Sequence, residues 1–435
     1  MDNTLNIKIK EIKEGAINIS GSSGLKRNEM LNQIKNALIE KKAEIFLSNQ
    51  EDLERAEKNN LNTPLIKRLV FNEEKLSSVC EGIDKLIELE DPVGKVLSRR
   101  LLDEKLLLEK VAFPIGVICM IFEARPDALV QISSLCLKSG NSILLKGGID
   151  AISTNRILVK IIKETLENSE IGSKWIQLLE THQDVEDILK MEKDIDLIIP
   201  RGSNKFVRYI MENTKIPVIG HSEGLCTIYV DHNADVNLAN KICYDSKTNY
   251  PAACNSVETI LVNQDVASSF LTTFVKNKDI VIYGDKKVKE IIDCEVAEED
   301  AFDTEYLDKK IAIKIVKDID EAINHIQKHS SHHTEAIITA DNKNKLRFAK
   351  EVDSADVFIN CSTRFADGFR FGLGAEVGIS TGKIHCRGPV GLEGLMTSKW
   401  LLQGCGQIVS SYSEGKKFIH EELPIEGESY ILKEN

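Results

Sequence analysis

Short apolar runs that alternate with helical segments constrain the fold of this chain more than any other feature. The strand-like runs of the first series lie at 116–121, 142–145, 196–199, 217–219 and 227–230. Between them are amphipathic stretches such as 151–168 and 185–192, where apolar residues recur every three or four positions. Strands that alternate with helices of this length predict a mostly parallel sheet with helices on both faces.

A second α/β series begins near residue 239. Its strand-like runs lie at 258–262, 312–316, 335–340 and 356–360, with helices expected at 320–327 and 343–352. The segment STRFADGFRFGLGAEVGISTGKIHCRGPVGLEGL (362–395) then contains too many glycines for a regular element. Long glycine-rich loops in compact domains are usually functional, so we expect this segment to line a cleft. At 435 residues the chain is too long for one hydrophobic core, and several domains are expected.

Two further regions flank these series. The charged–apolar alternation of SRRLLDEKLLLEK (98–110) fits an extended hairpin or arm. The polar tail after Ser410 is either frayed or a strand used between subunits. Residues 26–60 have the apolar spacing of helices.

Composition excludes several classes of function. A formal net charge of −12 argues against a general nucleic-acid or anionic-membrane surface. The ten cysteines form no CxxC pair and no zinc-like spacing, and adjacent His332 and His333 do not share a face, so no metal site is predicted. The N-terminus has no apolar signal region, and the longest apolar stretch (111–122) is too short to span a bilayer. We expect a cytoplasmic protein with free thiols.

Cys254 has the most reactive setting among the cysteines. In NYPAACNSVETILV a proline and two small residues precede it and a strand follows, which places the thiol on a turn at a strand edge. There a side chain can reach a cleft, and flanking backbone N–H groups favour a thiolate and stabilise an oxyanion. The alternative is a small buried hydrophobic residue, as most cysteines are.

Two strand–glycine–helix junctions are candidate phosphate sites. The run SILLK ends at Lys146, and two glycines and a helix follow it. PRGSNKF (200–206) has a similar order, with Arg201 and Ser203 beside the glycine. Free N–H groups and the helix dipole face the loop in such junctions, which suits an anion. Alternatively, Lys146 is a surface lysine beside a flexible turn, and Ser203 only caps a helix.

Cations occur at the expected crevice. Arg125 follows the strand-like run at 116–121 and precedes Pro126, at the edge where α/β proteins bind ligands. Alternatively, Arg125 pairs with Glu123 and only holds the turn. Cations interleaved with glycine and proline in a loop indicate anion binding. In the glycine-rich segment they are Arg364, Lys383, His385 and Arg387.

The motifs, considered together, resemble one family. FPIGVICMIFEARPDAL, LCLKSGNSILLKGG, YPAACNSVETILV, HTEAIIT, DVFINCSTRF and FGLGAEVGISTGKIHCRGPVGLEGL occur in this order. They resemble the γ-glutamyl phosphate reductases (glutamate-5-semialdehyde dehydrogenases) of the aldehyde dehydrogenase superfamily. The resemblance covers residues from about 26 to 407, and several of the motifs are unlike those of other branches.

This resemblance implies a fold, a division into domains and partners. It implies two doubly wound, mostly parallel α/β domains with a small oligomerisation arm. Residues 1–96 and 112–238 are expected to form the cofactor-binding domain, 239–408 the catalytic domain, and 97–111 with 409–435 the arm. A homo-oligomer, dimer or tetramer, is expected, and the upstream glutamate kinase is a candidate partner.

The resemblance also implies a reaction. L-glutamyl 5-phosphate is reduced by NADPH to glutamate 5-semialdehyde with release of phosphate, the second step of proline biosynthesis. Carried over by motif, Cys254 is the nucleophile, Lys146 meets the adenosine ribose or its phosphate, and Gly202 and Ser203 precede the cofactor helix. Glu305 in TEYLD stands where the superfamily has a glutamate that contacts the nicotinamide ribose.

Three departures from the oxidising relatives bear on the chemistry. Arg125 stands in place of an oxyanion-binding asparagine and can also pair with phosphate. HSEGLCTIYVD (221–231) does not align with the glutamate base that activates water in those relatives, and a reductase must avoid hydrolysing its thioester. Ile149 stands where NAD-preferring relatives place an acid on the ribose 2′-hydroxyl, so a 2′-phosphate beside Lys146 is not repelled.

The resulting hypothesis is an NADP-dependent acyl-phosphate reductase that acts through a Cys254 thioester. Some of Arg125, Arg364, Lys383 and Arg387 are expected to hold the phosphate. One rival is a reductase or dehydrogenase for an acyl-CoA or a free aldehyde, which a comparison of substrates would detect. Another is a catalytically silent binding or structural relative, in which Cys254 would not react with iodoacetamide.

Overall fold

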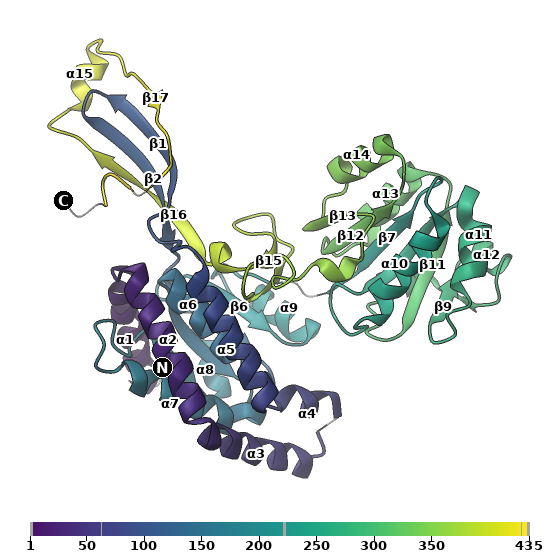
Figure 1. Ribbon diagram of the computed structural model, residues 1–435, viewed down its shortest axis with the longest axis horizontal. Coiled ribbons are helices and arrows are strands. Elements are labelled where there is room, and N and C mark those ends of the chain that lie inside the picture. The colour runs from purple at the N-terminus through teal and green to yellow at the C-terminus, as the bar shows by residue number, and fades with distance from the viewer. Residues whose placement is uncertain (1–2, 62, 221–222, 428, 433–435) are drawn as a thin grey trace.

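The computed structural model describes residues 3–61, 63–220, 223–427 and 429–432, which form two α/β lobes and a projecting arm (Figure 1). The first lobe contains a parallel sheet with strand order β5-β4-β3-β6. Its strands are β3 (Val117–Phe122), β4 (Ser142–Gly147), β5 (Ile176–Leu179) and β6 (Leu197–Arg201). Its helices are α1 (Asn3–Ser20), α2 (Gly24–Glu40), α3 (Lys42–Lys58), α4 (Thr63–Leu69), α5 (Glu73–Glu88), α6 (Pro126–Ser139), α7 (Ile152–Leu166), α8 (His182–Ile188) and α9 (Asn204–Glu212), with the 3₁₀ turn η1 (Ile149–Ala151). No helix in these ranges is long and apolar enough to cross a membrane.

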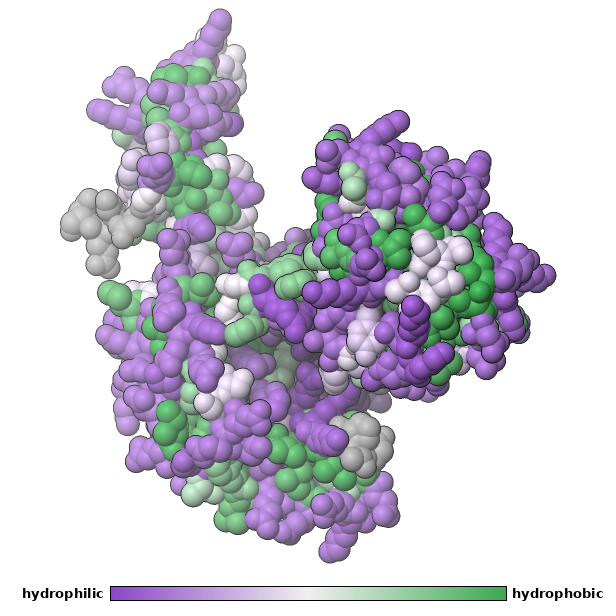
Figure 2. Space-filling model, turned by 45° about the vertical axis from the view of Figure 1, so that its right-hand side comes forward, coloured by the Kyte–Doolittle hydropathy of each residue, from purple (hydrophilic) through white to green (hydrophobic). Residues whose placement is uncertain are grey.

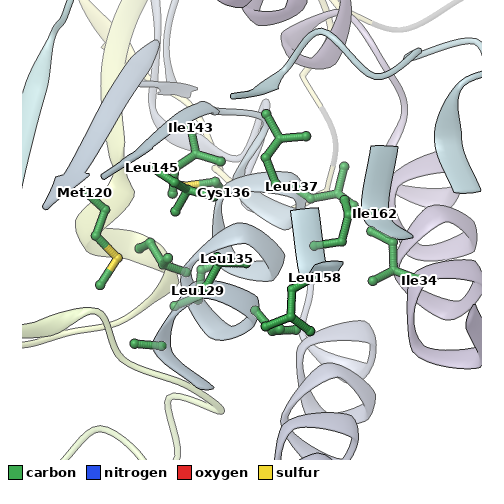
Figure 3. Close-up of a cluster of buried hydrophobic side chains, with 14 of the residues drawn as sticks. Ile34, Met120, Leu129, Leu135, Cys136, Leu137, Ile143, Leu145, Leu158 and Ile162 are labelled. Carbon is green, nitrogen blue, oxygen red and sulfur yellow. The ribbon is translucent and has the colours of Figure 1, made fainter. Parts of the chain in front are cut away.

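Hydrophobic side chains cover both faces of the first sheet. The even-numbered residues of β3 pack into one buried cluster and the odd-numbered residues into another, as the two-residue period of a strand requires. Figure 3 shows part of the first cluster between β3, β4 and the helices. Its labelled residues are Ile34, Met120, Leu129, Leu135, Cys136, Leu137, Ile143, Leu145, Leu158 and Ile162. Burial on both faces explains why these strands are continuous apolar runs.

The second lobe contains a seven-stranded parallel sheet with order β10-β9-β11-β8-β7-β12-β13. Its strands are β7 (Cys226–Val230), β8 (Val257–Asn263), β9 (Val281–Gly284), β10 (Glu295–Val296), β11 (Lys310–Val316), β12 (Thr334–Ile338) and β13 (Asp356–Ile359). Its helices are α10 (Val236–Thr248), α11 (Gln264–Phe274), α12 (Lys286–Lys289), α13 (Ile319–His329) and α14 (Asn342–Glu351), with the 3₁₀ turns η2 (Glu299–Asp303) and η3 (Thr363–Phe365). Two buried clusters, one on each face, hold this sheet.

The arm is an antiparallel sheet with order β16-β2-β1-β17. Its elements are β1 (Val96–Asp103), β2 (Leu106–Pro114), β16 (Met396–Gln403), α15 (Val409–Ser413) and β17 (Glu421–Glu422). Arg99 and Glu109 form an ion pair of 2.6 Å with both side chains buried, and Tyr430 of the tail packs on Arg99. The tail therefore belongs to this sheet, and the expected hairpin at 98–110 is the β1–β2 pair.

The structure divides the chain differently from the predicted boundary at residue 238. Strand β7 pairs with β8 and β12, so the second sheet begins at Cys226. Strand β16 pairs with β2 of the arm, although it falls within the range 239–408. Both differences arise from long-range pairing, because an apolar run does not indicate which sheet it joins. The run at 217–219 forms only an isolated bridge between Val218 and Ile198.

The glycine-rich segment leaves the second lobe and returns to the first. After η3 it forms the short hairpin of β14 (Gly378–Ser380) and β15 (Gly388–Val390), followed by the 3₁₀ turn η4 (Leu392–Leu395). Val377, Val390 and Leu395 are buried in the same cluster as β3 and α6. The segment thus runs from the second lobe to the first (Figure 1).

Candidate active site

The loop that carries Cys254 joins α10 to β8 and is held on three sides. Gly224 packs so closely against it that a Cβ there would lie 2.0 Å from the Cys254 carbonyl oxygen. The Cys226 thiol donates to the same oxygen at 3.2 Å. Asn255 Nδ2 donates to the carbonyl of Ala366 at 2.7 Å. A half-buried thiol in a pinned loop is a favourable arrangement for a nucleophile.

The environment of six other cysteines is less suited to reaction. Burial raises the pKa of the thiols of Cys119, Cys136, Cys226 and Cys243. Burial also raises the pKa of the half-buried Cys361, and that of Cys386 to about 11. A raised thiol pKa keeps sulfur in the unreactive thiol form.

Arg364 lies beside the nucleophile. It belongs to η3, and its Nε donates to Asn249 Oδ1 at 3.3 Å. Burial lowers the pKa of the Arg364 guanidinium and the charge of Arg370 adds to this, whereas negative charge on Cys254 opposes it. The guanidinium carbon is 5.9 Å from the centre of the Tyr250 ring. Arg364 is thus placed to stabilise negative charge on the sulfur.

Arg125 faces the same space from the first lobe. It is the N-cap residue of α6, and Ala124 before it has a φ of 42°, a left-handed turn that redirects the chain after β3. Burial lowers the pKa of Arg125, and the charge of Arg201 lowers it further. Tyr250 of the second lobe is among the groups that interact with it. In the described part of the chain the Arg125 guanidinium has no hydrogen-bond partner, so Arg125 does not pair with Glu123.

Lys383 and Arg387 have a different position from the one their loop suggested. Both form ion pairs with Asp353, and Arg387 Nη2 also donates to the Asp353 carbonyl at 3.1 Å. The two cations hold the pKa of the Asp353 carboxyl at about 2. Arg364 interacts with Cys254 and Arg125 with the nearby Tyr250, whereas Lys383 and Arg387 share the single carboxylate of Asp353.

The histidines of this region make structural contacts. The His385 ring lies 2.8 Å from the carbonyl of Gly394, and His332 Nδ1 lies 2.6 Å from the carbonyl of Asp353. His333 is buried beside Thr334. Within the described ranges, no three His, Cys, Asp or Glu side chains are grouped so as to hold a metal ion.

The first candidate phosphate junction lies at the end of β4. The Lys146 side chain is buried, and its Nζ donates to the carbonyl of Gly147 at 2.7 Å. Burial lowers the pKa of Lys146, which the charges of Asp184 and Glu180 oppose. Ile149, in the turn that follows, is 59% exposed. The exposed Ile149 and the buried Lys146 therefore both lie at this edge of the sheet.

The second junction lies at the N-terminus of α9. Ser203 is the N-cap residue, but its side chain makes no capping hydrogen bond. Its N–H donates to Glu123 Oε2 at 3.1 Å, and a Cβ on Gly202 would lie 2.7 Å from the same oxygen. Gly202 thus permits an anionic group to approach the first N–H groups of the helix. The alternative of a simple serine cap is not the arrangement observed.

Glu305 connects this helix to the nucleophile loop. Its Oε2 accepts from Asn204 Nδ2 at 2.6 Å, and its Oε1 accepts from the Gly224 N–H at 3.0 Å. Because Gly224 packs on Cys254, Glu305 lies between the first turn of α9 and the candidate nucleophile. The predicted site residues Gly202, Ser203, Glu305 and Cys254 are therefore near neighbours.

The segment that lacks the relatives' general base is only partly described. His221 and Ser222 lie outside the described residues. Glu223 is ion-paired with Arg208 of α9, so its carboxylate is already engaged. Nothing in the described part of this segment places a free carboxylate beside Cys254.

Sequence reasoning missed several residues of the site. Asn204 reaches it through its contact with Glu305 of the second lobe, and Tyr250 through its contacts with Arg364 and Arg125. Lys247 and Glu258 form a buried ion pair below the Cys254 loop. A charged residue within the apolar strand VETILV was the available signal for Glu258.

Comparison with known proteins gives consistent matches. The aldehyde dehydrogenase family profile matches residues 17–305. The γ-glutamyl phosphate reductase of Ruminiclostridium cellulolyticum is 51% identical over 94% of this chain and 95% of its own length. That of Pelotomaculum thermopropionicum is 51% identical over 96% of this chain and 98% of its own.

Solved structures agree with this assignment. The crystal structure of the γ-glutamyl phosphate reductase of Thermotoga maritima has a TM-score of 0.91 and 36% identity, and covers 93% of this chain and 99% of that one. An acetylating aldehyde dehydrogenase of Geobacillus thermoglucosidasius, at 16% identity, has the same fold with a TM-score of 0.67 over 93% of this chain and 97% of that one. The chain therefore belongs to the aldehyde dehydrogenase family, within the γ-glutamyl phosphate reductases.

Proposed function

We propose that this protein reduces L-glutamyl 5-phosphate to L-glutamate 5-semialdehyde with release of phosphate, the second step of proline biosynthesis. The observation that carries the proposal is the pinned, half-buried Cys254 with Arg364 beside it and Arg125 on the facing lobe. The names of the relatives at 51% identity support the substrate.

The first step is acyl transfer to Cys254. The thiolate attacks the γ-acyl carbon, a sulfur–carbon bond forms, and the carbon–oxygen bond to phosphate breaks with its electron pair on the departing phosphate. Arg364 supplies a positive charge beside the attacking sulfur. Phosphate leaves as an anion, so this step requires cations and no proton donor.

The first lobe fits a nicotinamide dinucleotide. The N-terminus of α9 would hold a pyrophosphate in place of the Glu123 carboxylate that accepts from the Ser203 N–H. Lys146 would contact the adenosine ribose, and Glu305 of the second lobe the nicotinamide ribose. When bound, the cofactor supplies the hydride that reduces the thioester. Ile149 is exposed and uncharged, so it would not repel a 2′-phosphate. We infer that NADPH is preferred over NADH.

The chain's own residues then release the aldehyde. Reduction of the thioester leaves an alkoxide on the former acyl carbon, and the unpaired Arg125 guanidinium supports the idea that it stabilises this charge. The alkoxide re-forms a carbonyl and expels the Cys254 thiolate, so no proton is needed here either. Glu223, already paired with Arg208, is not free to activate water and hydrolyse the thioester.

The arm suggests a homo-oligomer, dimer or tetramer. Figure 2 shows apolar side chains on the surface of the arm. The exposed large ones include Leu97, Trp400, Leu402, Ile408, Val409 and Phe418. Surfaces of this kind commonly mark protein contacts. A cytoplasmic location and a contact with glutamate kinase, which would shield a labile acyl phosphate, complete the proposal.

Absorbance at the NADPH band tests the function. Glutamyl phosphate, generated in situ by glutamate kinase, ATP and glutamate, is expected to oxidise NADPH only when this protein is present. Acyl-CoA substrates should give no turnover, and NADH should support a much lower rate. Turnover with an acyl-CoA alone would contradict the proposed substrate.

A further inference from the structure

Two arginines lie together where two parallel strands of the first sheet end. Arg201 is the last residue of β6 and is aligned with Phe122, the last residue of β3. Arg125 follows Phe122 by three residues. The charge of Arg201 is the largest influence on Arg125 after burial, which places the two guanidinium groups in one electrostatic environment.

Neither arginine is neutralised by the protein. In the described ranges, neither guanidinium has an ion-pair or hydrogen-bond partner. Asp127, the acid that acts on Arg125, is itself paired with Lys75 at 3.0 Å. Arg68 adds a third positive charge to the environment of Arg125. Partly buried like charges repel one another, so the arrangement is favourable only when an anion lies between them.

The glycine-rich segment makes room for this pair. A Cβ on Gly378 would lie 2.9 Å from Arg201 Nη1. Gly378 also has a φ of 155°, which other residues rarely adopt. The backbone therefore admits the guanidinium of Arg201 to the space between the lobes.

The environment of Arg364 is of a different kind. Arg370 is close to it, but Asp245 and Asp367 also act on its charge. Positive and negative charges side by side suit the α-amino-acid end of the substrate, which carries one carboxylate and one ammonium group. Among the charged groups that act on Arg125, Arg201 and Arg68 are positive and the one carboxylate, Asp127, is paired with Lys75, which suits a phosphate dianion.

We propose that Arg125 and Arg201 bind the phosphoryl group of the substrate, and the phosphate released from it, while Arg364 receives the α-amino-acid end. This inference rests on the proposed function and identifies which cations hold which substrate group. The departing phosphate takes the electron pair of the broken carbon–oxygen bond, and the two forks of N–H donors neutralise its added charge. Arg201 is then a substrate-binding residue.

The reverse reaction separates the two ends of the substrate. Glutamate 5-semialdehyde, NADP and inorganic phosphate are supplied, and NADPH formation is followed while each is varied in turn. R201Q is expected to raise the KM for phosphate about 10- to 100-fold, because charged hydrogen bonds are lost, and to leave the KM for the aldehyde within about twofold. R364Q is expected to show the opposite pattern. R201K keeps the charge without the fork and should be intermediate.

Controls and contrary results are well defined. R347Q, which removes a surface arginine of α14 paired with Asp320 and Glu351, should leave all three KM values unchanged. An unchanged phosphate KM in R201Q, or a rise in the KM for NADP instead, would overturn the assignment. Phosphate should also protect Arg201 from phenylglyoxal in the wild-type protein, as measured by peptide mass spectrometry. Protection by phosphate tests the anion site even if the wild-type protein shows no turnover. Absence of turnover would contradict only the proposed reaction.

Discussion

Lys247 Nζ lies 2.6 Å from Glu258 Oε2, with both side chains buried, and the stretch of chain between the two residues is the loop that carries Cys254. Lys247 is in the last turn of α10 and Glu258 is the second residue of β8, so the pair closes the base of that loop. Burial raises the pKa of the Glu258 carboxyl, and the charge of Lys247 opposes this. The base of the loop is therefore held by an ion pair in which each buried charge is stabilised by the other.

Removing one charge of the Lys247–Glu258 pair should lower the free energy of unfolding much more than removing both. Glu258→Gln leaves a buried ammonium without a counter-charge and is expected to lower the free energy of unfolding by about 3–5 kcal/mol. The double variant K247M/E258L should recover most of this loss, because an apolar pair of similar size needs no desolvation of charge. Urea unfolding of the three proteins measures both effects. A loss below about 1 kcal/mol in E258Q would contradict this account.

Gly224 is expected to be required for the position of the nucleophile. A Cβ at this residue would lie 2.0 Å from the Cys254 carbonyl oxygen, so Gly224→Ala must displace the loop. A displacement of this size can lower kcat about 100-fold. NADPH binding, measured by fluorescence, should be retained.

Gly82 provides a matched control for that substitution. It lies within α5, and nothing is within 4 Å of where its Cβ would be. Gly82→Ala should leave kcat unchanged and stabilise the helix by about 0.5–1 kcal/mol. Equal activity of the two alanine variants would show that the Gly224 contact does not matter.

His325 is expected to make the second lobe sensitive to acid. It is 5% exposed, and burial lowers the pKa of its ring to about 3, with the charges of Lys314 and His329 adding to the shift. Between about pH 6.5 and pH 3 the unfolded chain binds a proton that the folded chain does not. The free energy of unfolding therefore decreases as the pH is lowered, by up to about 1.4 kcal/mol per pH unit.

A substitution isolates this contribution. His325→Phe keeps the edge contact with Phe302, whose ring centre is 5.1 Å away, and removes the titrating group. Thermal melts from pH 7 to pH 4 should show a smaller loss in this variant than in the wild type. The exposed His420→Gln should retain the wild-type slope. Parallel curves for H325F and wild type would rule out the ring as the source.

Ile149 is expected to determine the choice of cofactor. It is 59% exposed beside the Lys146 junction, so Ile149→Glu places a carboxylate there without disturbing the core. Repulsion from a 2′-phosphate should lower kcat/KM for NADPH about 10-fold and affect NADH much less. Ile149→Gln, which has the same shape and no charge, should have a small effect on both. Equal losses with both cofactors would argue against this position.

Local patterns predicted most of the elements but not all of their partners. The alternation of strands and helices indicated two parallel sheets because strands buried on both faces are apolar throughout. The run at 227–230 was as clear as the others, yet its sheet is set by pairing with β8 and β12, which a single run does not encode. The turn before β8 similarly made Cys254 the candidate nucleophile, but it did not indicate which residues would contact that loop.

The cations illustrate the same limit within the site. Lys383 and Arg387 stand in a glycine-rich loop and suggested anion binding, but both pair with the carboxylate of Asp353, just after α14. The sequence placed Arg201 beside a candidate phosphate junction, but its position next to Arg125 follows only from the pairing of β6 with β3. The charge of a residue is local information, whereas its partner is a property of the fold.

The central claim is that Cys254 carries the acyl group, and a burst experiment without phosphate tests it most directly. Glutamate 5-semialdehyde and NADP are mixed with the protein, and NADPH is followed by absorbance while the acylated peptide is identified by mass spectrometry. We predict a burst of about one NADPH per subunit, a glutamyl group on the peptide that contains Cys254, and its release when phosphate is added. C254A should give neither burst nor adduct. A burst in C254A, or an adduct on another residue, would contradict the account.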